Sequence, residues 1–235
     1  MSKSWLTEVL RTDWYASDER GRARQFPEVN IAFWAIKVVA TAPGQMAGKA
    51  LILWASASLW GAVAALSAVC LISAIAARVA RDRFPEAIFW WAVSAITVIG
   101  AALAEAADSS LGIGDIAAAL NLTSYLVLSF VLWHRMTGAI SGLTEPTECG
   151  TFFWVTATLA QTVSSGLSDW TVDPDGLDSR VAAVVLLLGA GATAGLYLGT
   201  AAGRTALFWS AFIIAGIIGS LGGEFISKVV RLPLH

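Results

Sequence analysis

Four ionisable residues stand at matching places in four similar segments of the chain. In each segment the residue fifteen positions after the Trp of a Phe-Trp pair is charged, which gives Lys49, Glu105, Asp169 and Glu224. One ammonium and three carboxylates on neighbouring helices could bind or conduct a proton or a small cation, and Asp108 could join them. The same groups also suit a structural ion-pair network that holds helices in register. Both interpretations stay open from the sequence.

A stripe of polar residues precedes these charges. Residues four and eight positions before a charged residue lie on the same face of a helix as that residue. The polar ones among them are Thr41, Gln45, Thr97, Gln161, Ser165 and Ser220. Polar and ionisable side chains within a membrane span normally face the interior of a helix bundle and find partners there. We therefore expect the stripe and the four charges to point inward towards one another.

The spacing after each Phe-Trp pair indicates a fourfold internal repeat. The pairs are Phe33-Trp34, Phe89-Trp90, Phe153-Trp154 and Phe208-Trp209. Ten and fourteen positions after each Trp the residues are all small: Gly44, Gly48, Gly100, Ala104, Ser164, Ser168, Gly219 and Gly223. Small residues at this spacing let helix backbones approach closely, which drives helix association in lipid. The helices that carry the pairs are expected to form the central seam, with each Trp as an anchor at the headgroup interface.

The composition is typical of an integral membrane protein. The 235 residues are 57% hydrophobic and 14% charged, against about 25% charged in an ordinary soluble domain. A hydrocarbon core about 30 Å thick needs roughly 20 apolar residues per helix. Stretches of that kind occur at about 29–50, 54–78, 86–107, 115–135, 149–169, 180–200 and 205–227. They are continuous and too long for transmembrane strands.

The predicted fold is an all-α, polytopic transmembrane helix bundle of about seven helices. Residues 29–235 form its single domain, built from helix-pair repeats at about 27–83, 84–146, 147–203 and 204–235, the last of them truncated. Residues 1–28 form a cytoplasmic N-terminal segment. Apolar side chains at helical spacing in this segment fit either a helix at the membrane interface or a solvated tail.

Basic residues predict the orientation, because Lys and Arg in short loops favour the cytoplasmic side. They gather in the N-terminal segment and in alternate loops, whereas the opposite loops are rich in Asp. The N-terminus is thus expected in the cytoplasm and the C-terminus outside the cell. Lys228 and Arg231 lie on the disfavoured side.

Several function classes are disfavoured. A net charge of −2 argues against a nucleic-acid partner, because phosphate binding needs clustered Lys and Arg. His134 and His235, the only histidines, lack neighbours that suggest a nucleophile or a metal triad, so no enzyme activity is expected. Lys228 follows Glu224 at a spacing that suits a retinal Schiff base, but at the membrane edge, so no cofactor is expected. The sequence does not identify a metal.

The chain resembles a family of uncharacterised bacterial repeat-containing integral membrane proteins, usually labelled predicted membrane-anchored proteins. The resemblance covers about 27–228 and is closest in "PEVNIAFWAIKVVATAPGQMAGK" and "RTALFWSAFIIAGIIGSLGGEFISK". It implies the fourfold repeat and a place in the bacterial cytoplasmic (inner) membrane. Where family members are acidic this chain has Gln45 and Lys49, so Lys49 is expected to act as a tethered counter-ion. Family members also have an eighth helix, whereas this chain stops at His235.

Two functional hypotheses follow. The first is a transporter-like membrane protein whose intramembrane charged cluster binds or conducts a proton or small cation. The second is a non-catalytic structural or accessory subunit of a larger membrane protein complex. The expected partners are membrane lipids, together with a second copy of the chain or another membrane protein that covers the seventh helix.

Overall fold

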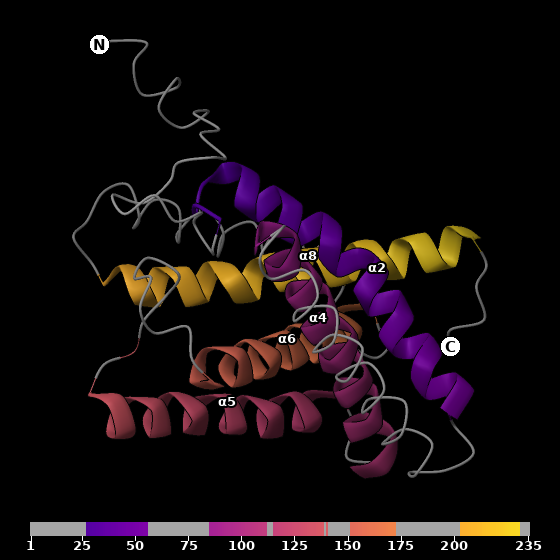
Figure 1. Cartoon of the computed structure of the whole chain (residues 1–235). Coiled ribbons are helices and arrows are strands. Elements are labelled where there is room, and N and C mark those ends of the chain that lie inside the picture. Colours follow the sequence, from indigo (N-terminus) through magenta and orange to yellow (C-terminus); the bar gives the residue numbers. More distant parts are fainter. Residues whose placement is uncertain are drawn as a thin grey trace, which may run out of the picture.

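The computed structural model of the chain describes residues 27–55, 85–111, 115–138, 140, 151–172 and 203–230. In these ranges it consists of α-helices without a strand: α2 (Ile31–Ala55), α4 (Pro85–Leu111), α5 (Asp115–Thr137), α6 (Thr151–Val172) and α8 (Arg204–Val230) (Figure 1). The all-α prediction is thereby confirmed for this part of the chain. The helix predicted at 180–200, nearly all of the one at 54–78 and residues 1–26 lie outside the described residues.

Local signals set where the helices begin and end. The side-chain Oδ1 of Asn30 accepts a hydrogen bond of 2.9 Å from the backbone N–H of Phe33, which caps the first turn of α2. Pro85 occupies the first position of α4, where a missing N–H costs nothing. Gly138, at a φ of 79°, ends α5 and donates its N–H to the carbonyl of His134 at 2.9 Å, as a left-handed glycine commonly does.

Four of the helices form a closed ring. α2 packs against α4 and α8, and α6 packs against the same two helices. α5 lies outside the ring along α6 (Figure 1). Its direction is antiparallel to α6, because Trp133 near the end of α5 stacks on Phe152 at the start of α6, with ring centroids 6.3 Å apart. The ring helices are the four that carry the Phe-Trp pairs.

The Phe-Trp pairs meet at one end of this ring. Each Phe contacts the Trp of the following helix, with centroid distances of 5.2 Å for Phe33–Trp90, 5.9 Å for Phe89–Trp154, 5.6 Å for Phe153–Trp209 and 5.7 Å for Phe208–Trp34. The last contact returns to the first helix, so the series is closed. All four Phe side chains are buried. The ring helices therefore start at a common aromatic layer and lead away from it in the same general direction.

Small residues set the distance between neighbouring ring helices. Those with the closest contacts are Gly44 and Gly48 of α2, Gly100 of α4, and Gly216, Gly219 and Gly223 of α8. A Cβ added at Gly219 would lie 2.5 Å from the Cβ of Thr41 and 2.7 Å from the carbonyl oxygen of Val38, both in α2. In α6 the hydroxyl of Ser164 donates to the carbonyl of Ile213 in α8 at 3.0 Å. Close backbone approach thus joins α8 to both of its neighbours.

The ring interior contains many buried polar side chains beside its aromatic and aliphatic ones, and many large apolar side chains of the described helices are exposed. Lys37, Thr41, Gln45, Thr97 and Gln161 are completely buried. Large apolar side chains are exposed on α5 at Leu120, Val127, Leu128, Val131 and Leu132, and on α8 at Ile218, Phe225 and Val229. Among the described helices, two are long and apolar enough to cross a membrane, α4 over Ala87–Ala107 and α8 over Thr205–Val230.

Gly219→Ala is expected to destabilise the ring, because its new Cβ meets the α2 backbone. Overpacking of this kind costs about 1–3 kcal/mol, which should lower the unfolding temperature of the purified protein in detergent. Gly222→Ala is the matched control, since a Cβ there lies 3.9 Å from the Ala42 Cβ, an ordinary contact distance. Equal unfolding temperatures for the two variants would contradict the close packing of α8 on α2.

Candidate functional site

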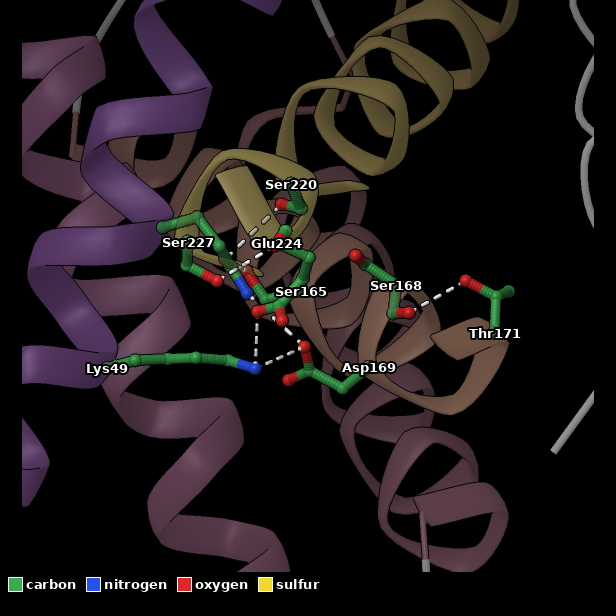
Figure 2. A network of polar contacts seen from close by, with 9 residues as sticks. Lys49, Ser165, Ser168, Asp169, Thr171, Ser220, Glu224 and Ser227 are labelled. Atoms are coloured by element: carbon green, nitrogen blue, oxygen red, sulfur yellow. Dashed lines mark hydrogen bonds and ion pairs between the residues drawn. The ribbon is translucent and has the colours of Figure 1, made fainter. Parts of the chain in front are cut away.

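A buried ion-pair cluster joins three ring helices. The ammonium of Lys49 in α2 lies 2.9 Å from Asp169 Oδ1 in α6 and 2.5 Å from Glu224 Oε1 in α8. The three side chains point towards one another between the helices (Figure 2). Their exposed fractions are 10%, 20% and 5% respectively. These ion pairs are therefore largely shielded from solvent, where charge interactions are strong.

A glutamine amide extends this cluster by one helical turn. Gln45 precedes Lys49 by four residues in α2 and is completely buried. Its Nε2 donates to Asp169 Oδ1 at 3.4 Å. Its Oε1 accepts from the hydroxyls of Ser165 at 2.7 Å and Ser220 at 3.2 Å. Both ends of the amide are thus used, which a buried polar group requires to avoid a desolvation penalty.

The fourth ring helix contributes a further carboxylate. Glu105 in α4 is half-buried and interacts electrostatically with Asp169. Lys49, Asp169 and Glu224 form direct ion pairs, and Glu105 is near enough to Asp169 to act on its charge. We call these four residues, the charges predicted from the repeat spacing, the charged cluster. Asp108 lies in the last turn of α4, and its side chain is outside the described part.

The deeper part of the predicted stripe does not join the charged cluster. The hydroxyl of Thr41 donates to the carbonyl of Lys37 at 2.8 Å, and that of Thr97 donates to the carbonyl of Val93 at 2.9 Å. These bonds stay within one helix and satisfy the hydroxyls there. Of the predicted stripe, only Gln45, Ser165 and Ser220 are brought into contact with one another beside the charges.

Lys37 is a buried ionisable residue that the repeat spacing did not predict as part of a site. Its side chain is completely buried, and its Nζ donates to Gln161 Oε1 at 3.1 Å. The Nζ also lies 3.8 Å from the centroid of the Phe212 ring. Lys37 precedes Thr41 by four residues, so one further step back along the stripe would have found it. The repeat pattern does not single out Lys37, because the other three segments have apolar residues three positions after the Trp.

Two buried polar atoms have no hydrogen-bond partner among the described residues, Gln161 Nε2 and Ser168 Oγ. Ser168 stands beside Asp169 in α6, and its carbonyl accepts from the Thr171 hydroxyl at 2.7 Å (Figure 2). Within the described ranges no group of three His, Cys, Asp or Glu side chains is arranged to hold a metal ion. The ammonium of Lys49 instead stands between the two nearest carboxylates.

The charged cluster can accept positive charge. It combines one ammonium with three carboxylates, two of which bond the ammonium directly. A buried net charge is unfavourable unless another group compensates it.

Comparisons with family models, curated proteins and solved structures found no match for this chain, so its function is inferred from these residues and their geometry.

Lys49→Met should lower the stability strongly, because it leaves Asp169 and Glu224 buried without their shared ammonium. Removing one partner of a buried pair costs about 3–5 kcal/mol, and we expect a lower yield of folded protein and a lower unfolding temperature in mild detergent. Lys228→Met, at an exposed lysine of α8, is the control. Equal unfolding temperatures for the two variants would show that the ion pairs of Lys49 do not stabilise the fold.

Proposed function

We propose that the chain is a multi-pass protein of the bacterial cytoplasmic membrane, related to the repeat-containing family that its motifs resemble. Its buried polar side chains and exposed large apolar side chains support this, because a protein in water has the opposite arrangement. The length and apolarity of α4 and α8 support it further. The closed series of Phe-Trp contacts and the ring of helices support four related units around a common axis.

The membrane assignment predicts where the protein is found in the cell. The chain should stay in the membrane fraction after an alkaline carbonate wash, which removes peripheral proteins. A reporter active only in the cytoplasm should work when fused at the N-terminus, and a reporter active only outside should work at the C-terminus. Release by carbonate would contradict the assignment, and the reverse reporter pattern would contradict the orientation.

We further propose that the protein is transporter-like and that its charged cluster binds a proton or a small cation. The observation that carries this proposal is the charge imbalance among the described residues, since the charged cluster holds three carboxylates and one buried ammonium, which pairs with two of them. A proton or a small cation would compensate the excess negative charge. Transporters place such sites among polar, small-residue-rich helices at the interface between repeats.

The position of Lys49 gives it a role in this proposal. Its ammonium lies where an ion bound by both Asp169 and Glu224 would lie. An incoming cation must therefore displace the ammonium from at least one carboxylate, and the ammonium returns when the cation leaves. Lys49 acts as a tethered counter-ion that keeps the empty site compensated and makes cation binding weak and reversible.

The aromatic layer limits how an ion could cross the protein. The cluster lies in the second half of the ring helices, and the buried Phe33, Phe89, Phe153 and Phe208 close the ring at the other end. In the proposed orientation the cluster faces the outside and the aromatic layer faces the cytoplasm. Transport then requires the aromatic layer to open, because apolar constrictions exclude ions by removing their water.

Asp169→Asn tests the transport proposal. Purified protein in liposomes should move protons or one of Na⁺, K⁺ and Li⁺ down an imposed gradient, reported by dyes for pH and membrane potential. The variant should lose this flux while it elutes as folded protein, because the amide keeps the shape of the carboxylate without its charge. Asp173→Asn, four residues further along the chain, should transport normally. Absence of flux from the unaltered protein would contradict the proposal.

A structural role is the second candidate, favoured by the direct bonds of Lys49 to both α6 and α8. A non-catalytic subunit would use these bonds to hold the ring for assembly with other membrane chains. It would show no flux, and Asp169→Asn would reduce its yield and abolish co-purification of a partner chain. The flux assay and the yield of the same variant therefore separate the two candidates.

A further inference from the structure

A second polar site lies deeper in the ring, three helical turns before Lys49 along α2. It consists of Lys37 in α2 and Gln161 in α6, with the ring of Phe212 in α8 against the ammonium. Lys37 and Gln161 are both completely buried. Twelve residues of helix separate Lys37 from Lys49, or about 18 Å, so this site is distinct from the charged cluster.

The site has more hydrogen-bond donors than acceptors. The ammonium of Lys37 has three N–H groups, of which one is used by Gln161 Oε1. The Nε2 of Gln161 adds two more N–H groups and has no partner among the described residues. Among the described residues, Lys49 forms ion pairs with carboxylates, whereas Lys37 does not.

Among the described residues, no hydrogen bond satisfies the remaining donors of Lys37 and Gln161. The nearby hydroxyls of Thr41 and Thr97 donate to carbonyls of their own helices, and neither is bonded to Lys37 Nζ or Gln161 Nε2. The face of Phe212 attracts the ammonium, but cation–π attraction offsets only part of the cost of burying a charge. The described acids of the ring, Glu105, Asp169 and Glu224, lie at the level of Lys49.

The surplus of donors selects the class of ligand. A water molecule would accept hydrogen bonds but bring two donors of its own, so the surplus would persist. An anion accepts several donors, brings none and compensates the ammonium. The packing favours a small anion, because a Cβ added at Gly216 would already lie 3.2 Å from Gln161 Oε1 and one at Gly100 would lie 3.1 Å from Gln161 Cγ.

We propose that Lys37 Nζ and Gln161 Nε2 bind a monatomic halide, with chloride as the physiological ion. The halide lies between the two nitrogens and holds the Lys37 amine in its protonated form as a neutral ion pair. It thereby supports packing between α2 and α6 across the ring. This site does not depend on transport at the charged cluster, and it exists whether or not that cluster moves an ion.

Bromide is the probe for this site, because it replaces chloride and scatters anomalously. Crystals of the full chain grown in bromide should show an anomalous peak within hydrogen-bond distance of Lys37 Nζ and Gln161 Nε2. The purified protein should also unfold at a higher temperature in chloride or bromide than in gluconate, since an ion that binds the folded state stabilises it. Gluconate is the comparison anion, because it is much larger than a halide.

Lys37→Met supplies the matched variant, since its side chain has similar length and no charge. It should lose both the bromide peak and the halide-dependent rise in unfolding temperature. It should still fold, because an apolar side chain of similar volume often replaces a buried charge without loss of stability. Lys228→Met, at an exposed lysine, should keep the peak and the halide effect.

Three results would overturn the proposal. They are the absence of a bromide peak at Lys37 in the unaltered protein, a peak that is present equally in Lys37→Met, and an unfolding temperature that does not depend on the halide. The first does not require any variant to fold. None of these outcomes bears on flux, so the halide site and the transport proposal fail separately.

Discussion

The ammonium of Lys49 is shared between a carboxylate of α6 and a carboxylate of α8, and this sharing links three of the four ring helices. Each of these ions loses hydration on burial, which costs several kcal/mol, and only close pairing with additional hydrogen bonds offsets the loss. The hydrogen bonds come from Gln45, which is held in turn by hydroxyls of α6 and α8. The relative positions of α2, α6 and α8 are therefore coupled to the charge state of one cluster.

The rest of the ring makes this burial of charge feasible. At one end, aromatic side chains contact one another around the full circle. Between the ends, glycines bring the backbones so close that an added Cβ at Gly48 or Gly219 would overlap the next helix. Close backbones leave little room for water, which strengthens each ion pair and raises the cost of each unpaired polar atom. The same packing thus stabilises the paired Lys49 and isolates Lys37.

The spacing of residues after each Phe-Trp pair predicted much of the ring. Charges fifteen residues after each Trp were predicted to converge, and Lys49, Asp169 and Glu224 do so because the ring helices start at one aromatic layer and run in the same general direction. Spacing could not show that Lys49 would take the central place between two carboxylates, since that depends on side-chain length and on the fit of three helices. The spacing also did not predict Lys37, because this lysine occurs in the first segment only and the matching positions of the other three segments are apolar. The inward direction of Gln161 was expected, but its partner was not.

Exchange of charges between positions 49 and 224 tests the central claim most directly. Lys49→Glu alone puts like charges together and should lower the unfolding temperature strongly, whereas Lys49→Glu combined with Glu224→Lys restores one ammonium beside two carboxylates. The unfolding temperature of the double variant in detergent should recover most of the loss, because an ammonium from α8 then faces Asp169 and the new carboxylate at position 49. If the double variant is as unstable as the sum of the two single variants, these side chains do not pair in the folded protein.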